Sequence, residues 1–75
     1  MKLFLVNCGY YEREFFDGLF EMHVTVPIVA ESRDEAKLKV KSQPYFEKHR
    51  MHVDGIYELE RAGDYKIALN HEISI

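Results

Sequence analysis

A histidine and an aspartate lie two positions apart in the segment HRMHVDG, residues 49–55. Side chains alternate between the two faces of a strand, so His52 and Asp54 project to the same face if this segment is extended. A carboxylate beside an imidazole orients the ring and raises its basicity, which suits a general base or the support of a metal ligand. The pair is the first candidate for a ligand-binding site.

Two further histidines extend this candidate set. His23 lies on the polar face of another predicted strand, and His49 lies just before His52, where it could bend back. If the two strands are aligned neighbours, His23, His52 and Asp54 converge, and two histidines with a carboxylate form an open ligand set for a divalent transition metal. The candidate metal ligands are thus His23, His49, His52 and Asp54.

The alternative is that these histidines have no such role. A histidine at the start of a strand often only hydrogen-bonds a backbone group or a neighbouring acid. The sequence contains neither paired CxxC motifs nor HExxH. Cys8 lies in an apolar segment and is expected to be a buried, inert thiol. No P-loop, GxGxxG or Ser-His-Asp order is present, so no catalytic residue is assigned and no cofactor is required.

The length allows a single domain, residues 1–75. A chain this short buries only about 60–65% of its unfolded surface, so its own core gives marginal stability. Disulfides, metals or self-association usually compensate for this. The single cysteine excludes an internal disulfide, which leaves a metal or an oligomer. We expect the oligomer, and specifically a homodimer.

The charge distribution bears on partners. The net charge of −3 gives no general attraction to nucleic acid or to an anionic membrane. Residues 33–50 contain six basic and three acidic residues, so this segment carries +3 and the remainder −6. The basic segment is expected to be a solvated helix face. The alternative is an accessory contact with nucleic acid through four basic side chains, namely Lys37, Lys41, Lys48 and Arg50.

The sequence also bears on location. The apolar run Leu3–Val6 before Cys8 is shorter than the roughly seven to fifteen residues that a secretory signal needs. No stretch approaches the roughly 18–20 apolar residues of a membrane span. Together with the lone thiol, these features predict a cytoplasmic protein with no membrane contact.

Hydrophobic periodicity predicts strands on both sides of one helix. Residues 2–8 are apolar on both faces, as in a strand inside a sheet, and residues 19–31 alternate strictly, with Pro27 indicating an edge or a bulge. Ser32 and Glu35 form a capping box that opens a helix of about ten residues, ended by Pro44. The connection 9–18 is unusually aromatic, and two uses are open for it: its rings fold back as core, or they present a contact surface.

The remaining segments predict a hairpin. Residues 52–60 and 65–70 read as strands around a turn at 61–64, with Val53, Tyr57 and Leu59 on one face. Residues 71–75 are expected to extend the second strand or to dock on a partner. The order β-β-α-β-β predicts an α+β fold, with one four-stranded, mainly antiparallel sheet and a single helix on one face. One short helix covers only part of such a sheet, which is the main reason to expect a homodimer.

Several segments together resemble a known family. They are KLFLV, FEMHVTVPIVAES, HVDGIYELE and DYKIAL. Over roughly residues 1–70 they resemble the DUF1543 family of short bacterial proteins of unknown function. Five residues fall on matching positions of that family's pattern, namely Glu21, His23, Ser32, His52 and Asp54.

The resemblance implies a fold and a mode of packing, but no activity. The family occurs in one or two copies per protein, which implies that two such domains can pack together. Val24 stands where the family has an acid after the histidine, and Asp64-Tyr65 replaces a Gly-Tyr element. If that acid is a ligand or a base in the family, this chain lacks it.

These observations favour a small self-associating domain that acts by binding, without catalysis, with His23, His52 and Asp54 as its ligand site. The first alternative is a metal-binding or hydrolytic site built on the same residues. The second alternative is the accessory nucleic-acid contact through the basic segment 33–50.

Overall fold

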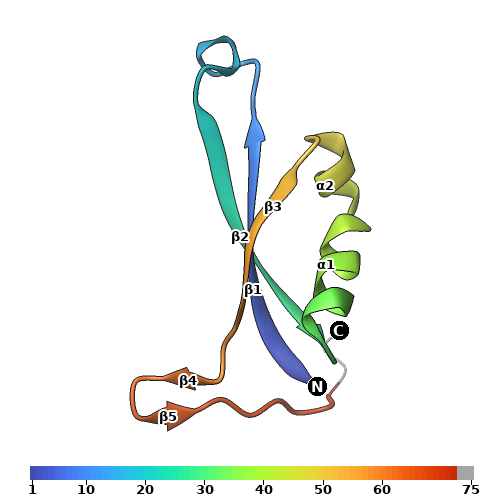
Figure 1. The fold of residues 1–75 in the computed structure, drawn as a ribbon, viewed down its shortest axis with the longest axis vertical. Helices are drawn as coiled ribbons and strands as arrows, with labels where there is room; N and C mark the ends of the chain where they lie inside the picture. The colour runs from blue at the N-terminus through green and yellow to red at the C-terminus, as the bar shows by residue number, and fades with distance from the viewer. Residues whose placement is uncertain (73–75) are drawn as a thin grey trace.

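A three-stranded antiparallel sheet forms the centre of the computed structural model, which describes residues 1–72 (Figure 1). Strand β1 (Lys2–Tyr11) lies between β2 (Glu21–Ala30) and β3 (His52–Glu58). Because β2 and β3 both run antiparallel to β1, they run in the same direction and begin at the same end of the sheet. The α+β class predicted from the sequence is confirmed.

The central position of β1 follows from its composition. Phe4, Val6 and Cys8 are almost fully buried on one face, while Leu3 and Leu5 on the opposite face are half-buried. A strand that is apolar on both faces is typical of the interior of a sheet, where a neighbouring strand lies on each side of it. The prediction that this segment lies inside the sheet is therefore confirmed. Strand β2 is an edge strand, as the missing N–H of Pro27 requires.

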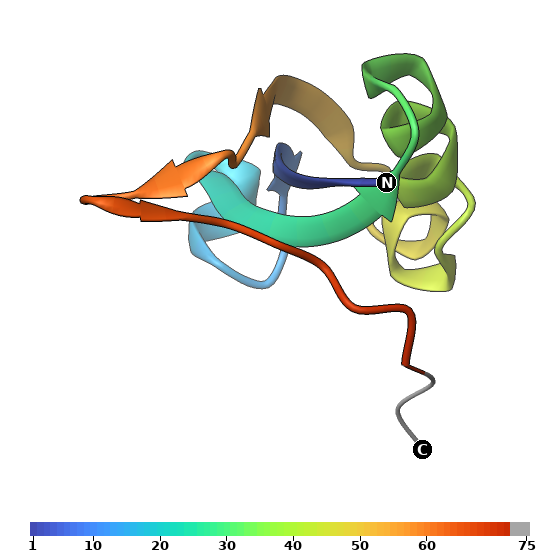
Figure 2. The same cartoon turned by 90° about the horizontal axis from the view of Figure 1, so that it is seen from below.

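Two helical segments cover one face of the sheet (Figure 2). Helix α1 (Arg33–Lys41) begins as predicted, because the Ser32 hydroxyl accepts a hydrogen bond from the amide of Glu35 at 3.2 Å. The Glu35 carboxylate reaches back to the amide of Glu31 at 3.3 Å. Pro44 does not only end this helix. It also occupies the first turn of a short second helix, α2 (Pro44–Lys48), where its missing N–H costs nothing.

The core lies between these helices and the sheet. The fully buried apolar residues of the described chain number six, three from β1, one from β2 and two from α1. They are Phe4, Val6, Cys8, Ala30, Ala36 and Val40. Phe46 of α2 packs against this cluster and completes its cover, as expected. The opposite face of the sheet has no helix over it in residues 1–72.

A β-bulge in β3 changes the faces that its side chains occupy. Asn7 pairs with Gly55 and Cys8 pairs with Val53, so Asp54 has no partner on β1. The extra residue shifts the alternation by one position. Val53 and Ile56, three positions apart, therefore both pack on the core. The prediction that Tyr57 shares the face of Val53 is wrong, and Tyr57 is 66% exposed on the uncovered face.

The predicted fourth strand of the sheet does not form. Residues 61–66 instead make a separate two-stranded hairpin, β4 (Arg61–Ala62) with β5 (Tyr65–Lys66), which projects from the sheet (Figure 1). The bond from the amide of Leu59 to the carbonyl of Leu3 is the last backbone hydrogen bond between this segment and β1 within residues 1–72. Helix α1 packs chiefly over β2 and β1, so a strand outside β3 would have no helix to cover its apolar side chains.

The segment after β5 is extended but forms no strand through residue 72. The expected extension over residues 73–75 lies outside the described residues. No helix within residues 1–72 has the length and the apolar character needed to cross a membrane.

Candidate functional site

Four side chains from the two outer strands gather over the central strand. Glu21 and His23 come from the start of β2, and His52 and Asp54 come from the start of β3. The register places both histidines directly opposite Gly9 of β1, one on each side. Because residues two apart share a face, Glu21 and Asp54 join the histidines on the uncovered face of the sheet.

The polar atoms of these side chains lie close together. Oε1 of Glu21 lies 2.8 Å from Nε2 of His23 and 3.0 Å from Nε2 of His52. Nε2 of His52 lies 3.1 Å from Oδ1 of Asp54, and Nε2 of His23 lies 3.5 Å from Oδ2 of Asp54. The two carboxylates therefore face both imidazoles, and each ring N–H has an oxygen acceptor within reach. We call Glu21, His23, His52 and Asp54 the four-residue cluster.

Gly9 makes this convergence possible. A Cβ atom at position 9 would clash with Oε1 of Glu21 and would lie 2.7 Å from both Oδ2 of Asp54 and Nε2 of His52. Real Cβ atoms do not approach other atoms so closely, so any larger residue would displace these groups. The four-residue cluster occupies the space that a side chain on the central strand would fill.

The bulge positions Asp54 for the site. Val53 remains in the core and holds β3 against the helices, while the extra residue allows Asp54 to project to the opposite face beside His52. Bulges commonly re-aim a side chain in this way near functional sites. The same feature that spoils the regular alternation of β3 thus supplies one of the four polar groups.

Hydrogen bonds hold Glu21 in its charged form. Its partial burial alone would raise the pKa of the carboxyl. The hydrogen bonds from His52, Tyr11 and His23 outweigh this, so the pKa of Glu21 lies below its ordinary value. The Tyr11 hydroxyl donates to Oε2 of Glu21 at 3.2 Å, and this bond together with the carboxylate charge raises the pKa of Tyr11. Glu21 is therefore an ionised acceptor at neutral pH, with Tyr11 as a further support.

The geometry suits a metal ion. Oxygen and nitrogen atoms from Glu21, His52 and Asp54 lie within 4.8 Å of one another, and His23 approaches the two carboxylates. Ligands bound at about 2.0–2.2 Å in a tetrahedron are separated by roughly 3.3 Å. The four separations between a histidine Nε2 and a carboxylate oxygen, 2.8–3.5 Å, bracket that value. Nitrogen and oxygen donors of this kind could hold a divalent transition metal with little rearrangement.

The structure places most of the sequence-predicted residues together. His23, His52 and Asp54 converge as expected, although their strands are separated by β1. His49 lies elsewhere, because it ends α2 on the helix-covered side. Its ring lies 5.1 Å from that of Tyr10, and its Nδ1 lies 3.7 Å from a Glu12 oxygen. The hypothesis that His49 bends back toward the site is wrong.

Glu21 was not among the predicted site residues. The sequence carried a signal for it, because Glu21 and His23 are two apart on the clearest strand, as His52 and Asp54 are on theirs. An acid and a histidine at this spacing on two strands form matching pairs. Gly9 could be identified only from the register, because its role depends on which strands flank it.

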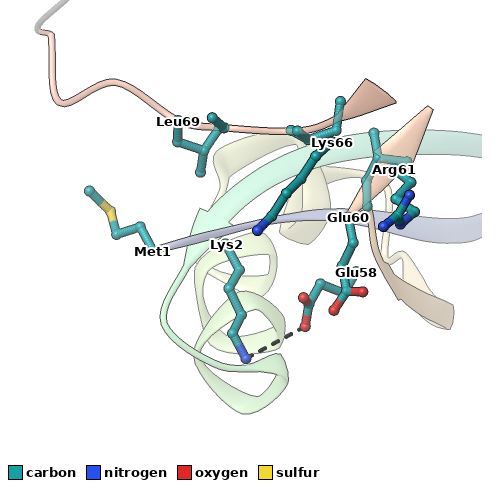
Figure 3. Close-up of a pocket in the computed structure, with 10 residues that line it drawn as sticks. Met1, Lys2, Glu58, Glu60, Arg61, Lys66 and Leu69 are labelled. Atoms are coloured by element: carbon teal, nitrogen blue, oxygen red, sulfur yellow. Dashed lines mark ion pairs between the residues drawn. The ribbon is translucent and has the colours of Figure 1, made fainter. Parts of the chain in front are cut away.

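Other chemically competent groups lie apart from the cluster. Cys8 is buried as expected, and its burial together with the charge of Asp54 raises the pKa of the thiol. A hollow of about 530 Å³ lies between the N-terminus of β1 and residues 58–69 (Figure 3). Its Lys2 pairs with Glu58 at 3.6 Å, and the hydrogen bond with Glu58 raises the pKa of Glu60. No histidine lines the hollow.

Comparisons of the chain with models of protein families, with curated proteins and with solved structures gave no match. The resemblance to the DUF1543 family stays a prediction. The function is therefore inferred from the geometry of the site.

Replacing Gly9 with alanine should separate the four-residue cluster, because the new methyl group needs the space that Glu21, His52 and Asp54 occupy. We expect the histidine side-chain resonances of His23 and His52 to shift and the pKa of Glu21 to rise, as measured by NMR titration. The matched control is Gly55→Ala, whose methyl group meets the exposed ring of Tyr57, at 3.2 Å. Equal effects of both substitutions would contradict this role of Gly9.

Replacing Tyr11 with phenylalanine removes one hydrogen bond to Glu21, so the pKa of Glu21 should rise toward its ordinary value. A carboxyl whose folded pKa is lowered stabilises the fold above its unfolded pKa, about 4.3, and this stabilisation is lost as pH falls through the folded pKa. The Tyr11→Phe protein should therefore lose less stability than the parent on acidification below about pH 4.3. Carboxyl NMR titration and urea unfolding measure both effects. Tyr57→Phe is the control, and an unchanged pKa of Glu21 in Tyr11→Phe would refute the link.

Proposed function

We propose that the chain is a small metal-binding domain that holds a divalent transition metal through Glu21, His52, Asp54 and His23. The observation that carries the proposal is the convergence of donor atoms from both outer strands over Gly9. Imidazole ligands favour zinc and its first-row neighbours over calcium and magnesium, which take oxygen ligands. The site residues inferred from the sequence are retained, with Glu21 added and His49 removed.

The number of donors favours binding over catalysis. Catalytic zinc sites keep three protein ligands and an open position for water or substrate, whereas structural sites are filled by four. Glu21, His52 and Asp54 supply three donors within 4.8 Å of one another. His23, which lies close to both carboxylates, would be the fourth donor and would leave a tetrahedral metal no free position. A metal would also join β2 to β3 across β1 and would supplement a core of only six fully buried residues. A hydrolytic site on the same residues is the alternative, and it requires one of the four to remain unbound.

The nucleic-acid alternative receives little support from the described residues. Lys39 is engaged, because its ammonium donates to the carbonyl of Val29 at 2.7 Å and pairs with Glu35 at 3.0 Å. The exposed Phe15, Phe16 and Phe20 lie in the loop between β1 and β2, next to acidic residues, and no exposed aromatic residue of the described chain belongs to α1. Aromatic and basic groups must be interleaved to bind single-stranded nucleic acid.

We also infer that the chain self-associates as a homodimer. The small core and the uncovered face of the sheet support this. Beyond the four-residue cluster, that face presents an apolar stripe consisting of Leu3, Leu5, Pro27, Val29 and Tyr57. A cytoplasmic location remains part of the proposal and agrees with the free, buried thiol of Cys8.

Zinc should raise the melting temperature of the untagged protein. A free zinc concentration one hundred times the dissociation constant adds about 2.7 kcal/mol to the free energy of unfolding. Replacing His52 with alanine should weaken zinc binding by about a hundredfold or more, because losing a ligand costs more than the 10–100-fold loss from removing an outer partner. Titration calorimetry measures the affinity. His49→Ala is the control and should bind zinc like the parent, and zinc binding that survives His52→Ala undiminished would contradict the proposed site.

Self-association predicts a mass of twice the chain's 8.9 kDa in sedimentation equilibrium at micromolar concentration. The second copy compensates for the surface that a chain of this size cannot bury alone. The measurement should be made with and without zinc, so that dimer formation and metal binding are separated. A monomer mass across the accessible concentration range would contradict the homodimer.

A further inference from the structure

The loop that joins β1 to β2 ends in an exposed apolar tip. Phe15, Phe16, Leu19 and Phe20 are 53–73% exposed, and we call these four residues the aromatic tip. The rings of Phe16 and Phe20 pack edge to face with centroids 5.3 Å apart. The tip lies at one end of the long axis of the molecule, beyond the helices (Figure 1). These side chains pack on one another and not on the core.

The backbone keeps the aromatic tip turned outward. Phe16, Asp17 and Gly18 have consecutive positive φ angles of 51°, 54° and 76°. Such angles are common for glycine and tolerated by aspartate, but they are unfavourable for phenylalanine. The chain thus adopts an unfavourable conformation at Phe16 while this ring stays 73% exposed. Burial in the chain's own core does not explain this arrangement, whereas contact with a second surface would.

The charges around the tip select the kind of partner. Glu14 and Asp17 are exposed beside the apolar side chains of the tip. The nearby basic residues Arg13, Lys48 and Arg50 line a hollow together with Glu12 and Glu14. An apolar tip with acidic flanks fits an apolar spot with basic flanks. It does not fit an anionic membrane, which attracts basic segments.

The chain itself carries the complementary surface. Leu38 of α1 is 70% exposed, and Lys37 and Lys41 beside it are also exposed. Residues three and four apart adjoin on a helix, so these three side chains form one patch, which we call the basic stripe. The exposed Asp34, four residues before Leu38, borders this patch. Leu38 itself is free of the core.

We propose that the aromatic tip of one copy docks on the basic stripe of a second copy, and that the second copy returns the same contact. This rests on the self-association proposed above, but it places the contact at the aromatic tip and α1, outside the apolar stripe of the uncovered sheet face. The tip and α1 lie at different heights along the long axis (Figure 1), so two antiparallel copies related by a two-fold axis can form both contacts together.

The available area agrees with a reciprocal contact. At 150–250 Å² for a whole aromatic side chain, the exposed parts of the aromatic tip amount to roughly 500 Å². A stable interface takes about 800 Å² from each partner. One tip alone falls short of this value. A tip and a stripe contributed by each copy approach it.

Charge reversal tests the contact through two variants. The first, Glu14→Lys with Asp17→Asn, makes the tip basic; the second, Lys37→Glu with Lys41→Glu, makes the stripe acidic. Each variant alone sets like charges against each other and should weaken dimerisation at least tenfold in native mass spectrometry. Mixed together, they should form the heterodimer with an affinity near that of the parent dimer. Lys66→Glu, on the distant β5, is the matched control and should dimerise like the parent.

The apolar part of the contact is tested separately. Phe16→Ser with Phe20→Ser should also weaken dimerisation at least tenfold, whereas Tyr65→Ser, which alters an equally exposed aromatic residue on β5, should not. Circular dichroism before mixing verifies that every variant keeps the parent melting curve. A double variant that does not keep it is replaced by one of its two single substitutions.

The outcomes separate the two proposals. A monomeric parent chain overturns both the homodimer and the docking surfaces. A dimeric parent whose variants all dimerise normally, or whose charge-reversed variants fail to form a heterodimer, overturns the docking surfaces alone. Binding of the monomeric parent to vesicles of phosphatidylcholine and phosphatidylserine, abolished by Phe16→Ser with Phe20→Ser, would assign the tip to membranes and overturn the proposal.

Discussion

The absence of a side chain at Gly9 is the constraint on which the candidate site depends. In a three-stranded sheet the outer strands are separated by the central one, so their side chains normally meet only across its residues. Removing the central side chain opens a space into which His23 from one edge and His52 from the other can lean. Glu21 then accepts hydrogen bonds from both rings and closes the cluster. Without that space, the same residues would remain two separate pairs on opposite edges.

The fold serves this arrangement in two further ways. The bulge in β3 keeps Val53 in the core while Asp54 joins the polar face. The same short segment can therefore serve both the packing of the core and the candidate site. The helices occupy only the other face, which leaves the cluster accessible. A metal bound there would connect the first residues of β2 and β3. Because the aromatic tip comes directly before β2, the site lies next to the tip at the end of the sheet where β2 begins.

Local features of the sequence predicted the parts of the fold that are decided locally. The strict alternation around Pro27 gives an edge strand, and the Ser32 cap gives the start of the helix, because both depend on neighbouring residues alone. The prediction of a fourth strand was wrong, because such a strand forms only if a helix covers that side of β3. The convergence of the histidines was anticipated from residue spacing. The contribution of Glu21 and the position of His49 required the strand order and the path of α2, which no local pattern specifies.

Nitrogen-15 NMR of the histidine side chains during a zinc titration tests the central claim most directly, because it observes each ring separately. The account predicts that the Nε2 signals of His23 and His52 shift together and saturate at one zinc per chain. The rings of His49 and His71, which lie outside the cluster, should keep their signals. A titration that leaves His23 and His52 unchanged, or that shifts His49 and His71 instead, would show that the four-residue cluster is a network of hydrogen bonds and not a metal site.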